Sequence, residues 1–325
     1  MSKIKALHTA DIHIGMENYG YLNPNTGLNT RLEDFLKSFD IMVDYAIDNQ
    51  IDIFIFAGDA FKTQSPTPTQ HREFAKRIYR LSQANIPIVL LAGNHDLANR
   101  YGEATSVNIY ETLSIDNVYV IERPKFELIK TKNGYVQILG IPYVSKSGFL
   151  TNEEYTGKSL EEIENILIKK IDSLIDGYIA KADKEIPLVL TFHAGIDRAI
   201  MGAERDLMIG KAFCVPLSVV NKKGLDYVAL GHIHKHQILC QEPPVIYSGS
   251  IERVDFGEEV EDKGFVIVSL EKDNTSFEFI KLPARKFITI DAEIKENENP
   301  NEILVNTILK KDVKDAIVRL RYSIS

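Results

Sequence analysis

Histidine, aspartate and asparagine side chains recur in five short motifs along this 325-residue chain. In chain order the motifs are DIH at 11–13, GD at 58–59, GNHD at 93–96, HAG at 193–195 and GHIH at 231–234. Each motif ends or follows an apolar run of strand-like composition, so we expect each polar group where a strand ends. Strand ends in α/β sheets face a crevice, where side chains are available to bind ligands.

Structural roles would explain each motif separately. Aspartate after an apolar strand is commonly a turn former or helix cap, and Gly-Asp and Gly-Asn are frequent turn dipeptides. His232 and His234 would share one face of a strand, with Ile233 on the other. Metal chemistry explains all the motifs together, because mixed carboxylate, imidazole and amide donors suit manganese, iron or zinc. A two-metal centre also needs a bridging ligand, which a carboxylate supplies.

The elements that must position these residues alternate between strand and helix in the first half of the chain. Apolar runs predict buried strands at 4–9, 51–57 and 86–92. Helical periodicity predicts amphipathic helices at 31–49 and 69–84. This order implies parallel strands joined by right-handed crossovers.

From residue 118 onward the pattern is mostly strand, interrupted by one long helix at 159–181. The predicted strands are 118–121, 126–130, 136–144, 186–192, 226–230, 236–240, 245–248, 265–270 and 275–282. We therefore expect an α/β fold, a four-layer sandwich of two mixed β-sheets flanked by helices. Residues 1–283 would form this domain. Residues 284–325 predict a strand, a helix and a strand, the start of a small α/β capping domain that is incomplete.

Composition is typical of a folded enzyme: 44% of the residues are hydrophobic and 26% are charged. The formal net charge of −8 argues against non-specific coating of DNA, but carboxylates that hold divalent cations become a phosphate-attracting centre. No apolar run is long enough for a signal peptide or membrane span, so we expect a cytoplasmic protein. Cys214 and Cys240 form no disulfide framework or zinc motif and are expected to be buried or half-buried.

The ordered motifs DIHIG, GDAF, GNHD, FHAG and GHIHKH resemble the calcineurin-like metallophosphoesterase superfamily. The continuations GNHDLANRYGEAT and YSGSIERVDFGEE resemble its DNA-repair branch, the SbcD and meiotic recombination eleven nucleases. The resemblance covers residues 4–283 and extends weakly into the capping domain. It implies a metal-dependent DNA nuclease of double-strand-break repair, with exonuclease and single-strand endonuclease activity.

The resemblance also implies two divalent ions, for which we expect manganese. The residues that would hold them are Asp11, His13, Asp59, Asn94, His193, His232 and His234. One ion would bind Asp11, His13 and His234, the other would bind Asn94, His193 and His232, and Asp59 would bridge them. His95 matches the family's catalytic histidine, which faces the scissile phosphate and donates to the leaving oxygen, and Asp96 would orient it.

Substrate contacts are expected from three residues after the last motif: Tyr247, Ser248 and Arg253. The alternative for them is a tight turn whose arginine pairs with a nearby glutamate. Among the other histidines, His8 is predicted in the core and His71 in solvent. His236 is expected either beside the substrate or on a strand surface.

The resemblance implies a homodimer, with an interface near 31–49 and 67–114, and an ABC-type ATPase of the SbcC kind as partner on nucleoid DNA. The ATPase-binding segment is expected after the capping domain, so we expect this chain to cleave DNA without binding the ATPase stably. Two alternatives stay open. The same site would act on a small phosphodiester or phosphoprotein, or the protein would be a scaffold that binds DNA ends without cutting, which the intact His95 disfavours.

Overall fold

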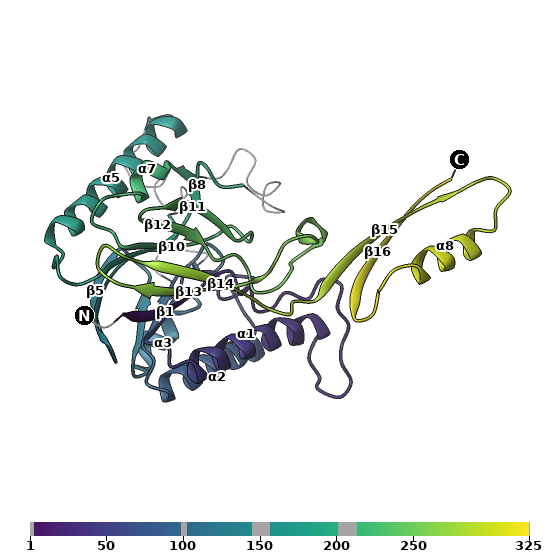
Figure 1. Cartoon of the computed structure of the whole chain (residues 1–325), viewed down its shortest axis with the longest axis horizontal. Helices are drawn as coiled ribbons and strands as arrows, with labels where there is room; N and C mark the ends of the chain where they lie inside the picture. Colours follow the sequence, from purple (N-terminus) through teal and green to yellow (C-terminus); the bar gives the residue numbers. More distant parts are fainter. Residues whose placement is uncertain (1–2, 99–102, 145–156, 201–212, 325) are drawn as a thin grey trace.

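Two six-stranded β-sheets pack face to face with helices on their outer faces (Figure 1). The computed structural model describes residues 3–98, 103–144, 157–200 and 213–324. The four layers confirm the predicted sandwich. Among the described residues, no helix combines the length and the apolar composition needed to cross a bilayer.

The first sheet contains the strands of the N-terminal alternating pattern. In spatial order its strands are β14 (Ser276–Lys281), β13 (Gly264–Leu270), β1 (Ile4–Thr9), β2 (Ile53–Phe56), β3 (Ile88–Leu91) and β4 (Val118–Ile121). Strands β1 to β4 are parallel, which confirms the prediction for the first three, whereas β13 and β14 are antiparallel to their neighbours. Helices α1 (Thr30–Asp48) and α2 (Pro68–Gln83) connect the first three parallel strands and cover the outer face.

The second sheet is built from the strands that follow. In spatial order they are β11 (Gln237–Gln241), β12 (Pro244–Tyr247), β10 (Tyr227–Gly231), β7 (Leu188–His193), β6 (Gly134–Ile141) and β5 (Lys125–Thr131). The four central strands are parallel and the two edge strands antiparallel. Helix α5 (Leu160–Lys181) covers the outer face with four buried side chains at helical spacing: Ile163, Leu167, Ile171 and Ile175.

Polar caps determine where the long helices begin. The side chain of Asn29 caps α1, and Thr67 and Ser159 form capping boxes with Gln70 and Glu162 at the starts of α2 and α5. The observed helices therefore differ from the predicted ones by only one residue at each start.

Short elements were not predicted, because they contain too few residues for a periodic pattern. They are α3 (Asn108–Thr112), α7 (Leu217–Val220), β8 (Gly195–Ile196), β9 (Cys214–Val215) and the 3₁₀ turn η2 (Phe256–Glu258). Cys214 and Cys240 are both half-buried, as expected.

An apolar layer between the two sheets holds them together. Side chains of β2 and β3 such as Ile55 and Val89 pack there against Val189, Ala229 and Ile246 of the second sheet, all fully buried. Because the central strands have apolar residues on both faces, their sequences are continuous apolar runs rather than alternating patterns. The layer brings the carboxyl ends of both sets of parallel strands to one edge of the sandwich.

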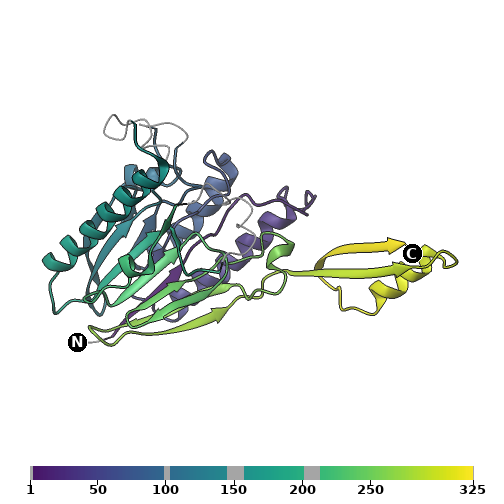
Figure 2. The ribbon, with the colours of Figure 1, turned by 90° about the horizontal axis from the view of Figure 1, so that it is seen from above.

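A small α/β unit projects from this body (Figure 2). It consists of β15 (Lys286–Ile294), α8 (Pro300–Leu309) and β16 (Ala316–Ile324), with the two strands parallel. The order agrees with the pattern predicted for residues 284–325, whereas the domain boundary stays a prediction. No residue of α8 is buried, so this unit encloses little apolar surface within the described chain.

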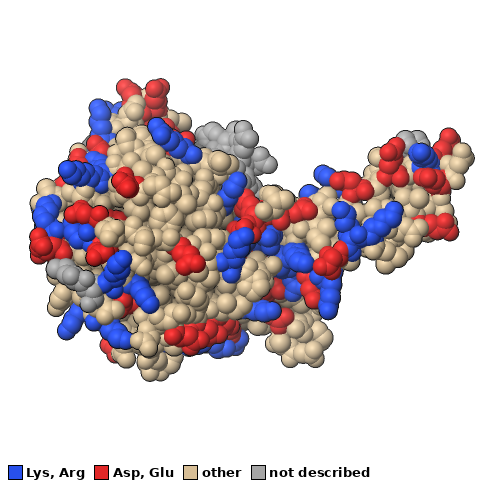
Figure 3. Space-filling model, viewed as in Figure 1, with Lys and Arg blue, Asp and Glu red and all other residues tan. Residues whose placement is uncertain are grey.

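The junction between body and small unit is aromatic and charged. The Phe287 ring lies 4.9 Å from Phe256 of η2 and 5.6 Å from Tyr19. Arg285 donates to the Asp34 carboxylate of α1 at 2.6 Å. On the face drawn in Figure 3, positive and negative side chains are interleaved, including around this junction.

Arg31 is the buried centre of this junction, and we expect its removal to destabilise the protein. It is 1% exposed, bonds Asp34 at 2.6 Å and the Arg253 carbonyl at 2.5 Å, and lies 3.6 Å from Glu252. Arg31→Ala would leave the buried Glu252 carboxylate without its cation, at a cost on the order of 3 kcal/mol in urea unfolding. Arg72→Ala, which removes an exposed arginine, is the control and should change the unfolding free energy by less than about 0.5 kcal/mol. Equal losses for the two variants would contradict this role of Arg31.

Candidate metal centre

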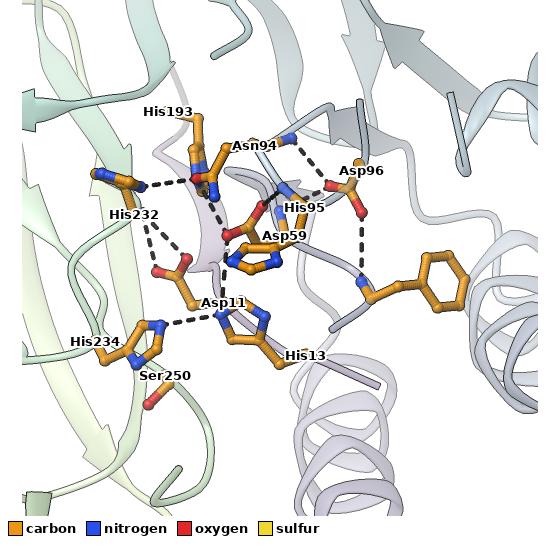
Figure 4. Close-up of polar contacts among 12 residues, drawn as sticks. Asp11, His13, Asp59, Asn94, His95, Asp96, His193, His232, His234 and Ser250 are labelled. Carbon is orange, nitrogen blue, oxygen red and sulfur yellow. Dashed lines mark hydrogen bonds and ion pairs between the residues drawn. The ribbon is translucent and has the colours of Figure 1, made fainter. Parts of the chain in front are cut away.

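The predicted ligands lie together at the edge where the parallel strands of both sheets end (Figure 4). Four of the seven come from the first sheet and follow β1, β2 and β3: Asp11, His13, Asp59 and Asn94. Three come from the second sheet, at the end of β7 and after β10: His193, His232 and His234. Residues more than two hundred positions apart therefore share one pocket, as the sequence hypothesis required.

Two groups of donor atoms meet at Asp59. On one side, His13 Nε2 lies 2.9 Å from His234 Nε2 and 3.8 Å from Asp59 Oδ2. On the other side, His193 Nε2 lies 3.0 Å from Asn94 Oδ1 and 3.4 Å from Asp59 Oδ2. The Asn94 oxygen is also 2.9 Å from His232 Nδ1. The Asp59 carboxylate thus faces both groups, a position from which it can bridge two cations.

The donor set fits divalent cations. Asp11 and Asp59 are at most 2% exposed, and no lysine or arginine within the described ranges forms an ion pair with either. Burial raises the pKa of Asp11 to about 7 and lowers that of His232 to about 3, so both favour their uncharged forms without a cation. Buried acceptors that face one another are unfavourable unless a positive charge lies between them.

Hydrogen bonds behind two imidazoles set the direction of their lone pairs. His193 Nδ1 lies 2.7 Å from the Ala57 carbonyl, and His234 Nδ1 lies 2.8 Å from a carboxylate oxygen of Glu258. Both partners are hydrogen-bond acceptors, so Nδ1 of each ring donates and Nε2 faces the pocket, the arrangement typical of histidine ligands. Sequence analysis assigned no role to Glu258.

Electrostatic interactions between the pocket residues also favour a bound cation. Burial by itself lowers the pKa of His193, but the neighbouring Asp59 carboxylate outweighs burial and raises that pKa to about 9. The proton on His193 therefore balances the charge of Asp59, and a cation at Asp59 would replace it. Burial would raise the pKa of Asp59, but the surrounding histidines hold it below its usual range.

Backbone strain is concentrated at the same residues. Asp11, His13, Asp59 and His232 have positive φ angles of 53°, 48°, 62° and 103°. Such conformations are uncommon for residues with a side chain and persist where neighbouring structure enforces them. Here the loops after β1 and β2 hold each other, since the Asp11 N–H donates to the Gly58 carbonyl and the His13 N–H to Asp59.

Asp96 has a different role from the one predicted. Its carboxylate accepts hydrogen bonds at 2.8 to 3.3 Å from four backbone N–H groups, those of Asp59, Ala60, Phe61 and Gly93. It therefore holds the loops after β2 and β3 in place instead of orienting the imidazole of His95. Burial raises the pKa of Asp96 to about 6, although the backbone donors oppose that shift.

His95 lies at the open side of the pocket. Its ring centroid is 5.0 Å from that of His13. One of its ring nitrogens lies within 4.8 Å of a ring nitrogen of His13 and of a carboxylate oxygen of Asp59. Its backbone N–H donates to Asp59 at 2.8 Å. His95, Asn94 and His232 are half-buried, whereas the other clustered side chains are buried, so these three border the mouth.

The residues predicted to contact substrate lie elsewhere. The fully buried Tyr247 donates its hydroxyl to the Ala194 carbonyl at 2.6 Å, and the buried Ser248 hydroxyl donates to Gly249. Arg253 donates to the carbonyls of Glu261 and Arg285, at 2.7 and 3.0 Å. These bonds position a turn and the junction with the small unit, so we do not assign the three residues to substrate. The alternative pairing of Arg253 with a glutamate side chain is also wrong, because its partners are backbone oxygens.

The remaining histidines lie outside the ligand groups. His8 is fully buried and lies 2.9 Å from the Tyr227 hydroxyl, which confirms the prediction of a core residue. His71 is half-buried against the Phe61 ring rather than solvated. His236 stacks on Phe279 of β14, with ring centroids 4.0 Å apart.

Tyr143 was missed by the sequence analysis. Its ring lies 5.5 Å from that of His232 and 6.2 Å from that of His193, so it borders the pocket. A signal was present, because Tyr143 follows the end of β6, a strand parallel to β7.

A methyl group at Gly93 should disrupt the pocket. A Cβ atom there would lie 2.2 Å from Asp59 Oδ1 and 2.4 Å from the Asp59 backbone nitrogen. We expect Gly93→Ala to lower divalent-ion affinity at least about tenfold in calorimetric titrations. Gly177→Ala is the control, since a Cβ on this exposed helical glycine meets no atom within 4 Å and should leave binding unchanged. Parental affinity in Gly93→Ala would contradict the pocket geometry.

Curated relatives match most of this chain. The DNA double-strand break repair protein Mre11 of Archaeoglobus fulgidus is 24% identical over 97% of this chain and 67% of its own length. The SbcD component of the Escherichia coli nuclease SbcCD is 26% identical over 78% of this chain and 62% of its own. YhaO of Bacillus subtilis, an uncharacterised metallophosphoesterase, is 25% identical over 99% of this chain and 69% of its own. The chain spans between 45% and 69% of the length of such relatives.

A solved structure and a family description also match this chain. A dimetal phosphatase from Danio rerio has a similar fold, with a TM-score of 0.50 and 10% identity over 86% of this chain and 97% of the other. The family description of calcineurin-like phosphoesterases matches residues 4–236, which include all seven clustered side chains. With most of its length matched in this way, the chain belongs to the calcineurin-like phosphoesterase family.

Proposed function

We propose that this protein is a divalent-metal-dependent nuclease that hydrolyses phosphodiester bonds in DNA during double-strand-break repair. The observation that supports it most directly is the convergence of six donor side chains from two sheets around Asp59. The relatives named as a double-strand break repair protein and as part of a nuclease support DNA as the substrate.

Two ions, most suitably manganese, would share the pocket. We assign one to Asp11, His13, Asp59 and His234, and the other to Asp59, Asn94, His193 and His232. Nitrogen and oxygen donors without thiolates suit this metal. Bound ions would supply Lewis-acid chemistry, which neutralises charge on a phosphate and activates water.

His95 is the group that we assign to the leaving oxygen. It lies at the half-exposed mouth, where a phosphate can approach, and its ring nitrogen is within 4.8 Å of Asp59 and His13. Its backbone N–H donates to the Asp59 carboxylate at 2.8 Å, which fixes the position of this residue beside the cluster. An N–H held at this position can donate to the oxygen that leaves phosphorus, which lowers the barrier for bond cleavage.

The chain also supplies the conditions in which metal chemistry is effective. The buried base of the pocket excludes water from Asp11, His13 and Asp59, so their interactions with cations are strong.

The partners proposed are DNA of the nucleoid in the cytoplasm, a second copy of the chain and an ABC-type ATPase of the SbcC kind, which would bind through a segment after the small unit. The SbcCD relative is named as one component of a larger nuclease, which supports the ATPase. For the homodimer, the supporting observation is exposed apolar surface at α2 and α3: Tyr79, Ile109 and Leu113 are 57%, 48% and 64% exposed. This surface lies within the predicted interface at 67–114.

Substrate choice is tested by cleavage assays with manganese. We expect labelled duplex and single-stranded DNA to be cut and a phosphopeptide to remain intact, with all cleavage stopped by a chelator. Cleavage of bis-nitrophenyl phosphate without cleavage of any DNA would favour the small-phosphodiester alternative. Binding of DNA ends without hydrolysis of any substrate would favour the scaffold.

The role of His95 is tested by His95→Gln. We expect the single-turnover rate of DNA cleavage to fall by about 100-fold or more, because the donor to the leaving oxygen is lost. Calorimetry should still show both ions bound. His71→Gln is the matched control, since His71 lies outside the ligand groups and should keep the parental rate. Parental cleavage by His95→Gln would show that the assignment is wrong.

A further inference from the structure

A buried carboxylate and a buried ammonium lie behind His234, on the side of the ring away from the pocket. They belong to Glu258 and Lys263, whose side chains are 0% exposed. We propose that this pair positions His234 and thereby sets the metal affinity of one half of the centre. The inference rests on the proposed metal centre, but it concerns residues outside the ligand set.

Glu258 has a partner for each carboxylate oxygen. Oε1 lies 2.8 Å from His234 Nδ1, and Oε2 lies 2.7 Å from Lys263 Nζ and accepts the Val254 N–H at 2.9 Å. A carboxylate only accepts hydrogen bonds, so the proton must lie on Nδ1 of the imidazole. The lone pair on Nε2 then faces the pocket, 2.9 Å from His13 Nε2.

Lys263 fixes the same histidine a second time. Its ammonium bonds Glu258 at 2.7 Å, Glu261 at 2.9 Å and the backbone carbonyl of His234 at 3.1 Å. An ammonium has three donors, so all of them are used. Ring and backbone of His234 are therefore held by one group. Lys263 directly precedes β13 of the first sheet, whereas His234 follows β10 of the second, so the pair also links the two sheets.

Stability alone does not explain this arrangement. Burying an ammonium with carboxylates is expensive, and apolar side chains of similar volume commonly stabilise a fold as well or better. Histidine ligands, in contrast, characteristically donate their second nitrogen to a carboxylate or carbonyl, which orients the ring and increases its basicity. Burial by itself raises the pKa of Glu258, but His234 and Lys263 outweigh it and hold the pKa below its usual range.

The two halves of the centre differ in the group that accepts a hydrogen bond from the second ring nitrogen of the histidine. His193 donates to a neutral carbonyl, that of Ala57, whereas His234 donates to an anion. Two carboxylates against one ammonium leave net negative charge beside His234. Loss of Glu258 should therefore weaken the ion at His234 and His13 and spare the ion at His193.

The adjacent Glu259 provides a matched control. Its carboxylate accepts from the backbone N–H and the hydroxyl of Thr289 in β15, at 2.8 and 2.6 Å, and so faces the small unit. Neighbouring glutamates thus point to different parts of the molecule. A charge change at position 259 therefore measures how much manganese binding changes when this turn loses a charge that does not face His234.

The experiment is a manganese titration of the metal-free protein by calorimetry. In Glu258→Ala we expect one of two binding steps to weaken by about 10-fold to 100-fold and the other to stay unchanged. Glu258→Gln, which keeps an acceptor oxygen but loses the charge, should weaken the same step less. Glu259→Gln should retain both steps. Thermal unfolding with chelator identifies variants that fail to fold. If Glu258→Ala fails to fold, Glu258→Gln takes its place in the titration.

A metal-free measurement separates this inference from the proposed function. In ¹⁵N-histidine spectra of the parental protein, His234 should hold its proton on Nδ1, and Glu258→Ala should shift it towards Nε2. Unchanged tautomer, or parental affinity for both ions, in a folded Glu258 variant would overturn the positioning role. If the parental protein binds no manganese, the proposed centre fails, and the tautomer comparison still decides the role of Glu258.

Discussion

The packing of one β-sheet on the other is the interaction on which the site depends, because neither sheet holds the complete set of proposed metal ligands. The apolar layer between the sheets brings their carboxyl ends together. At this edge the backbone of one sheet lies very close to residues of the other sheet. Glycines allow this approach because they have no side chain. A Cβ on Gly231 would lie 2.2 Å from the Ala57 carbonyl, and one on Gly58 would lie 2.3 Å from His193 Nδ1. Sheet packing thus converts separate strand ends into one pocket.

Such a pocket is costly for the fold. Buried carboxylates and imidazoles lose their hydration, and four ligands adopt positive φ angles. The surrounding structure offsets this with polar partners, of which Asp96 and its four backbone donors are an example. The result is a set of donors fixed in place before any ion or substrate arrives, which is the condition for precise binding.

The small unit is attached by a different kind of contact. Ion pairs and aromatic rings, such as Arg285 with Asp34 and Phe287 with Phe256, replace the thick apolar layer of the body. The turn η2, which contacts Phe287 through Phe256, also presents Glu258 to His234. Consequently the junction and the metal pocket share one short segment, although they occupy different parts of the molecule.

Local sequence was sufficient for the order of strands and long helices, for the parallel arrangement of β1 to β3 and for the motifs at strand ends. Apolar runs, helical periodicity and polar caps act between residues close in the chain, so they are visible without a structure. The role of Asp96, the burial of Tyr247 and the attachment of Arg253 to Arg285 depend on contacts between distant segments. The pairing of Glu258 with His234 also follows from tertiary packing, because only the folded chain brings the turn between β12 and β13 against the loop after β10.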